Sequence, residues 1–186
     1  MHHRSLSILG APLAGALILM SVSCETPASP TPELMEAEVQ PTFNRSVQSE
    51  VAQDDLLKAA RQATARFHSP TQALRAGYEP ADHCVEIPGV GGMGYHWANE
   101  SLVHDSFDPL EPQVLLYATG PSGRPELVGV EYVVIDVGQE HPTFGDHPFD
   151  VGGTPIPVDH WSLHVWLYEE NPEGIFEQFN PNVSCP

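Results

Sequence analysis

The sequence predicts an α+β fold in which an N-terminal helix packs on a small antiparallel sheet with long irregular loops. Apolar residues follow a helical period only before Gly77, whereas the β-branched and aromatic runs all come after it. The chain has 186 residues, which suits one ordinary domain with tails. We therefore expect a signal peptide at 1–23, a tether at 24–45 and a single domain at 46–186.

The clearest predicted helix covers residues 49–68, with the sequence SEVAQDDLLKAARQATARFH. Its acidic residues come early and its arginines late, as the helix dipole favours. The small and apolar residues are spaced by four, three and four positions, which places them on one face: Leu56, Ala60, Ala63 and Phe67. This face is predicted to lie close against the sheet.

A second, short helix is predicted over residues 71–76. Ser69 can serve as its N-cap, Pro70 suits the first helical position and Gly77 suits the end.

Three stretches have the composition of strands: VLLYAT at 114–119, LVGVEYVVID at 127–136 and WSLHVWLY at 161–168. A turn sequence, GPSGRPE, separates the first two, so they are predicted to form an antiparallel hairpin. Glycines and prolines recur through residues 136–157, which predicts a long loop. The glycine run at 89–94 predicts a tight turn.

The amino terminus has the features of a secretion signal. A short basic segment precedes an uncharged, mostly apolar run at 6–22, and the border MSVSC is similar to a bacterial lipobox. Cys24 is the predicted lipidation site, and a retained anchor helix is the alternative. The following segment, rich in proline, threonine and glutamate, is predicted to be a disordered tether. The protein is thus expected to be exported and membrane-anchored, facing the periplasm or the cell surface.

The cysteine count fits this compartment. With Cys24 assigned to the lipid, Cys84 and Cys185 remain as a pair, and disulfides persist in an oxidising environment. We predict that these two residues are bonded to each other.

The charge excludes one class of partner and favours another. Seven Lys and Arg stand against 25 Asp and Glu, which gives a net charge of −18. Such a surface repels phosphate backbones, so nucleic-acid binding is excluded. An acidic field attracts metal ions and cationic ligands, although a highly soluble surface adapted to a salty environment is the alternative.

Several short motifs occur together along most of the chain: GGMGYHW at 91–97, VGVEY at 129–133, LHVWLY at 163–168 and FNPNVSC at 179–185. Together with ATARF at 63–67, they resemble a family of uncharacterised exported bacterial proteins. The resemblance implies export but no activity.

Histidine is abundant after the signal, and three residues form a candidate metal site. His96 follows the glycine run, where the backbone can approach other elements closely. Glu131 lies in an apolar strand, where a buried carboxylate has to be paired, hydrogen-bonded or bound to metal. His164 lies on one face of the last predicted strand. Two imidazoles and a carboxylate suit zinc or copper and leave a coordination position for water or substrate.

The spacing of His160 and His164 suits a shared metal only on a helix. In a strand the two residues are about 13 Å apart, so His160 is expected at the rim of the site unless the strand begins after it. Aromatic residues expected to wall a pocket are Tyr95, Trp97 and Trp166. The loop residues His141, Asp146 and His147 are expected to form a lid.

Other catalytic templates are missing from the sequence, including C-x-x-C, G-x-S-x-G and the phosphate-binding loop. The expected function is that of an exported, lipid-anchored metal-binding protein; if it is an enzyme, the simplest activity is that of a metal-dependent hydrolase or lyase acting on a small substrate. Two alternatives remain: a non-catalytic module that binds metal or a small ligand, and a structural envelope protein whose histidines serve only in packing.

Overall fold

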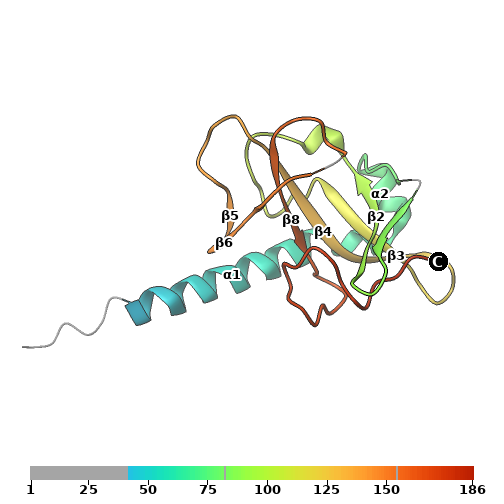
Figure 1. Ribbon diagram of the computed structural model, residues 1–186, viewed down its shortest axis with the longest axis horizontal. Helices are drawn as coiled ribbons and strands as arrows, with labels where there is room; N and C mark the ends of the chain where they lie inside the picture. The colour runs from blue at the N-terminus through green and yellow to red at the C-terminus, as the bar shows by residue number, and fades with distance from the viewer. Residues whose placement is uncertain (1–41, 82, 154) are drawn as a thin grey trace, which may run out of the picture. The chain divides into compact units, whose positions relative to one another are not determined.

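The computed structural model describes residues 42–81, 83–153 and 155–186, with side chains from Ser49 onward (Figure 1). The predicted signal peptide, Cys24 and residues 24–41 of the predicted tether lie outside this part of the chain. The predicted α+β class is confirmed, because one long helix accompanies an antiparallel sheet.

The first helix, α1, covers Thr42–Thr64 and continues as a single 3₁₀ turn, η1, over Ala65–His68. It ends where the sequence predicts but begins seven residues earlier, so residues 42–45 of the predicted tether are helical. The stop at Ser69 has a local cause: Pro70 disfavours helical dihedrals in the residue before it, and Ser69 is extended, with φ of −94° and ψ of 109°.

The second helix, α2, covers Pro70–Arg75 and confirms the predicted short helix. Pro70 occupies the start, and Ser69 occupies the N-cap position without making a side-chain capping bond. Gly77 follows with a φ of +93°, which suits the residue after a helix end.

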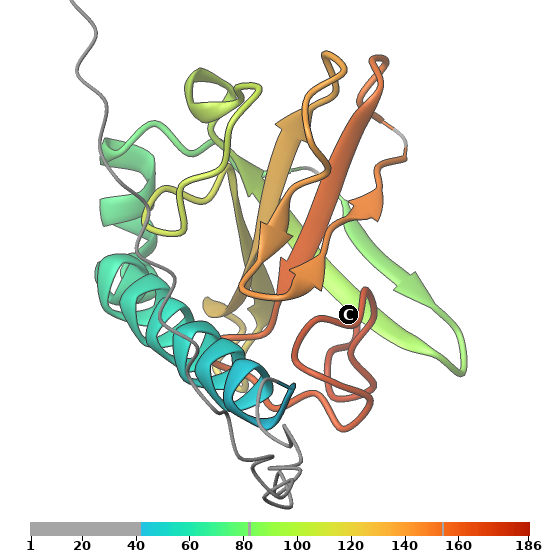
Figure 2. The same ribbon diagram turned by 90° about the vertical axis from the view of Figure 1, so that its left-hand side faces the viewer.

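Six strands form one sheet in the order β1-β2-β3-β4-β8-β7, with antiparallel pairing throughout (Figure 2). The strands are β1 Cys84–Ile87, β2 Gly91–Ala98, β3 Val114–Thr119, β4 Pro125–Ile135, β7 Asp150–Val151 and β8 His160–Val165. The predicted hairpin of β3 and β4 is confirmed.

The glycine-rich stretch differs from its prediction. The sequence predicts a turn over residues 89–94, whereas residues from Gly91 onward form β2 and the turn lies just before it. The glycines serve close packing within the sheet. A Cβ at Gly91 would collide with the backbone of Asn180, and Gly92 exchanges two hydrogen bonds of 3.1 and 3.0 Å with Asn180.

The sheet has two differently covered faces. On one face, α1 and η1 contribute Ala60 and Phe67 to a core with Leu115, Tyr117 and Leu163. The opposite face carries a smaller apolar cluster formed by Val114, Leu116, Val128, Val133, Trp166 and Val183. The second face is the one that holds the candidate site.

Residues 136–157 are more ordered than the predicted loop. They contain a two-stranded hairpin, β5 Thr143–Phe144 with β6 His147–Pro148, and the edge strand β7. Aromatic packing accounts for this order, because Phe144 and Phe149 are buried against Tyr132 and Phe107.

The predicted bond between Cys84 and Cys185 is present, with a Cα–Cα distance of 5.7 Å. It attaches the carboxyl-terminal segment to β1, and the Cys185 amide also donates a hydrogen bond to Glu86. Closing a loop of 101 residues in this way stabilises the fold by about 4–5 kcal/mol in the chain-entropy model.

None of the helices within the described residues combines the length and the apolar character needed to cross a membrane.

Candidate metal centre

Three strands bring His96, Glu131 and His164 together on the second face of the sheet. Glu131 in β4 lies directly opposite His164 in β8. Glu131 also lies opposite Val114 of β3, and His96 of β2 lies opposite Leu116, two residues further along β3. Because residues two apart in a strand share a face, all three side chains project to the same side.

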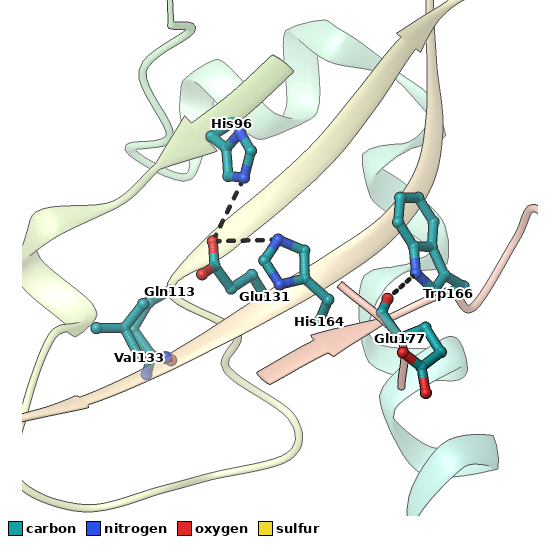
Figure 3. Close-up of polar contacts among 7 residues, drawn as sticks. All are labelled: His96, Gln113, Glu131, Val133, His164, Trp166 and Glu177. Carbon is teal, nitrogen blue, oxygen red and sulfur yellow. Dashed lines mark hydrogen bonds and ion pairs between the residues drawn. The ribbon is translucent and has the colours of Figure 1, made fainter. Parts of the chain in front are cut away.

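The three side chains converge on one point (Figure 3). The Nε2 atom of His96 lies 3.7 Å from Oε2 of Glu131, and Nε2 of His164 lies 4.0 Å from the same oxygen. One ligand atom from each residue lies within 4.8 Å of the other two. These side chains are 23%, 14% and 4% exposed for His96, Glu131 and His164, so the site is largely shielded from solvent.

Burial shifts the pKa values of all three groups toward their neutral forms. It lowers the pKa of His164 to about 4. It also lowers the pKa of His96, with smaller opposing effects from the charge of Glu131 and from a hydrogen bond to the Gly94 backbone. Burial raises the pKa of Glu131, against the opposing charges of His96 and His160 and a hydrogen bond from Ser162. Neutral imidazoles are the form that binds metal.

The arrangement fits a metal ion better than a set of internal hydrogen bonds. Distances of 3.7 and 4.0 Å are too long for direct hydrogen bonds between nitrogen and oxygen. The Nε2 atom of His164 is buried and has no hydrogen-bond partner, which is costly for a polar atom. A cation held by all three groups would satisfy this nitrogen and neutralise the buried carboxylate.

The site opens into a cavity of about 1060 Å³. Its polar lining includes His83, His160, Ser162 and Gln178, and its apolar lining includes Met93 and Val133. None of the described residues that border it is a lysine or an arginine.

A β-bulge shapes one wall of the cavity. The pairing of β1 with β2 shifts register between Val85 and Glu86, so that Met93 is the extra residue. Gly94 has a φ of +81° here, and a Cβ at this position would collide with the Tyr117 carbonyl. The bulge explains why Met93 and His96, three positions apart, both face the cavity.

The aromatic residues predicted to wall the pocket lie elsewhere. Tyr95 and Trp97 belong to the helix-covered face, because they alternate with His96 along β2. The prediction placed His96 in a turn, where neighbouring side chains do not alternate. Trp166 shares the face of His164 at a ring distance of 6.5 Å, but packs into the apolar cluster and donates a hydrogen bond of 2.6 Å to the Glu177 carbonyl (Figure 3).

The predicted lid residues also lie away from the cavity. His147 stacks on Phe176 at 4.3 Å, and His141 bonds the Phe149 carbonyl and packs near Trp161. Asp146 accepts a hydrogen bond of 2.6 Å from Ser49 of α1. Aromatic packing on the other face of the sheet therefore fixes this hairpin.

Two polar residues near the metal ligands were not predicted as part of the site. Ser162 lies between His160 and His164 on the same strand face, and its side chain acts to lower the pKa of Glu131. Alternation along WSLHVWLY puts Ser162 on that face, but a serine there gives no signal of its role. His83 borders the cavity and its charge acts on His96, although nothing in its sequence context indicates this.

Comparison with protein-family models, curated proteins and solved structures returns no match to this chain. The assignment of the site therefore depends on the geometry described above.

Proposed function

We propose that this protein is an exported, lipid-anchored metalloprotein that binds one zinc or copper ion through His96, Glu131 and His164. The supporting observation is the convergence of two imidazoles and a carboxylate from three strands around an unpartnered, buried nitrogen. Two nitrogen ligands with one carboxylate oxygen suit zinc and copper better than calcium or magnesium, which prefer oxygen.

The cavity beside the group supports a catalytic role as a hydrolase or lyase on a small substrate. Its volume of about 1060 Å³ is at the upper end of small-molecule sites. With three protein ligands, a bound zinc ion has a further position for water or substrate and lowers the pKa of coordinated water. Within the described residues the group has three members, which favours this open arrangement over a closed storage site.

Groups that neighbour the three ligands would tune their basicity and limit the access of water. The Ser162 side chain acts to lower the pKa of Glu131, and the Gly94 backbone acts to raise the pKa of His96. Contacts of this kind orient metal ligands and tune their basicity. The apolar side chains of Val114 and Val133 flank the group and limit the access of water.

Export and lipidation are proposed from the sequence of residues 1–24. The disulfide between Cys84 and Cys185 supports this proposal, because such bonds are rare in reducing compartments.

Elemental analysis tests the metal site. Purified protein is loaded with zinc or copper, desalted and analysed beside H96A, E131A and H164A. We expect about one equivalent in the wild type and a sharp loss in each variant. His68 contacts Tyr168 on the other face of the sheet, so H68A is a matched control that should retain the metal. Less than about a tenth of an equivalent in the wild type, or full retention by the three variants, would contradict the proposal.

A further inference from the structure

A further histidine, His160, borders the same cavity but lies away from the three-residue group. It begins β8 opposite Ile135, whereas His164 lies opposite Glu131. Four residues of extended strand separate the two histidines, about 13 Å along the chain. One metal ion does not span that distance at ordinary bond lengths. His160 is therefore free for another role in the cavity.

The ring of His160 is held in one orientation by a hydrogen bond. Its Nδ1 atom lies 2.7 Å from the carbonyl oxygen of Val158, and the residue is only 7% exposed. A carbonyl oxygen only accepts, so Nδ1 carries the proton in this bond. In the neutral imidazole, Nε2 is then a hydrogen-bond acceptor, and among the described residues it has no hydrogen-bonded partner.

The backbone of Gly152 packs closely against the His160 ring. A Cβ at position 152 would collide with the Nε2 and Cδ2 atoms of His160. The Gly152 amide also donates a hydrogen bond of 2.8 Å to the His160 carbonyl. The ring is thus fixed between Val158 and Gly152, with its acceptor nitrogen on the side away from the Val158 bond.

The rest of the cavity wall also lacks cationic donors. No lysine or arginine borders it within the described chain, whereas the carboxylates of Glu79 and Glu100 lie at its exposed part. The amide nitrogen of Asn99 already donates to the Ala76 carbonyl. In the metal-free protein, a negatively charged ligand would meet these carboxylates and no lysine or arginine to compensate its charge. A ligand with N–H groups would find acceptors.

We infer that the cavity binds an organic amine and that Nε2 of His160 accepts a hydrogen bond from its amino group, away from the three metal ligands. The inference deepens the proposed function, since it gives the ligand class of the same cavity. In the metal-free cavity, Glu79 and Glu100 disfavour a carboxylate or phosphate ligand. The anchoring does not require a metal, so it can be tested on the metal-free protein.

The test follows the histidine ring signals of ¹⁵N-labelled, metal-free protein by NMR at about pH 8, where ordinary imidazoles are neutral. Hexamethylenediamine is the probe, and adipate is the anionic control of similar length. We expect the diamine to shift the His160 signals in a saturable way, and the free protein to show the Nδ1–H tautomer. Adipate should leave these signals unchanged.

Two variants distinguish a hydrogen bond between His160 and the amine from a purely structural role of this side chain. In H160N the amide can still donate to Val158, but no acceptor remains at the position of Nε2. In H160Q the longer side chain carries a carbonyl near that position. We expect H160N to weaken diamine binding by about tenfold or more, and H160Q to remain within about threefold of wild type.

Three results would overturn the inference: no saturable shift of the His160 signals with diamine, equal binding of adipate, or undiminished binding by H160N. The wild-type titration decides the matter even if a variant fails to fold. Zinc content is measured separately on each protein. A wild type that binds diamine at His160 but no zinc would contradict the proposed metal site and leave the amine site supported.

Discussion

Burying the three ligand residues costs folding stability in the metal-free protein, whereas the same burial suits them to bind a metal ion. Burial disfavours the charged form of each group, so the metal-free site holds polar atoms without adequate partners. The sequence predicts that two of these polar groups are buried, because Glu131 interrupts an apolar run and His164 lies in an apolar strand. The convergence of all three residues was predicted from residue chemistry alone, whereas the pairing of β2 with β3 and of β4 with β8 that produces it was not predicted.

Acid should destabilise the metal-free protein through His164. Its pKa is about 4 in the folded state, against 6.5 for an ordinary histidine. The unfolded state therefore binds more protons between these values, and stability is lost as the pH falls from about 6.5 to about 4. The shift corresponds to roughly 3 kcal/mol. Urea unfolding across this range, with a chelator present, should show a smaller loss for H164Q. An equal loss in wild type and H164Q would contradict this assignment.

Replacing Glu131 with glutamine should have opposite effects with and without metal. Burial raises the pKa of Glu131, so its ionised form costs stability in the metal-free protein as the pH rises above the ordinary value. At neutral pH we expect metal-free E131Q to unfold at higher denaturant concentration than wild type. With zinc present, the order should reverse, because only the wild type gains from binding.

The exposed residue Glu126, on the same strand, provides the control for this experiment. E126Q should change stability by less than about 0.5 kcal/mol under both conditions. A metal-free E131Q that is less stable than wild type would show that the carboxylate is structurally paired.

At the level of elements, strands bounded by turn residues were predicted well. Strand β3 covers the predicted residues, since it is largely apolar, with β-branched and aromatic members, and glycine and proline follow it. Strand β2 was missed, because its glycines have the composition of a turn while close contacts with Asn180 and Tyr117 are what require them. These contacts are made by segments remote in sequence, so composition gave no sign of them.

Gly94 should control the position of His96. Alanine there would have to adopt a φ near +81° and would collide with the Tyr117 carbonyl. We expect G94A to lose about 1–3 kcal/mol of stability and to bind zinc more weakly, as measured by unfolding and by competition with a chelator. Gly123 has a φ of +75° but open space around it, so G123A provides the control for backbone strain alone. Equal zinc affinity in G94A and wild type would contradict a positioning role.

At the scale of the whole molecule, the larger hydrophobic core and the candidate metal site lie on opposite faces of the sheet. The face covered by α1 holds the larger core, and the opposite face holds the polar site in an open cavity. The disulfide attaches the carboxyl-terminal segment to β1, beside the strand that carries His96. The sequence predicted this bond from the cysteine count and the expected export, whereas the assignment of faces required the observed strand pairing.

The anchor is a separate prediction about the whole chain, and it concerns residues outside the described structure. Changing Cys24 to alanine should move the protein from the membrane to the soluble export fraction, because the lipid attachment site is removed. Detergent partitioning of wild type and C24A measures this. Unchanged partitioning would support a retained anchor helix instead.

X-ray absorption at the zinc edge tests the metal site most directly. The zinc-loaded protein should show two imidazole nitrogens at about 2.0–2.1 Å and oxygen ligands at about 2.0–2.2 Å, with H164A losing one imidazole. A sulfur shell at about 2.3 Å, or a zinc ion with fewer than two imidazoles in the wild type, would contradict binding by His96, Glu131 and His164.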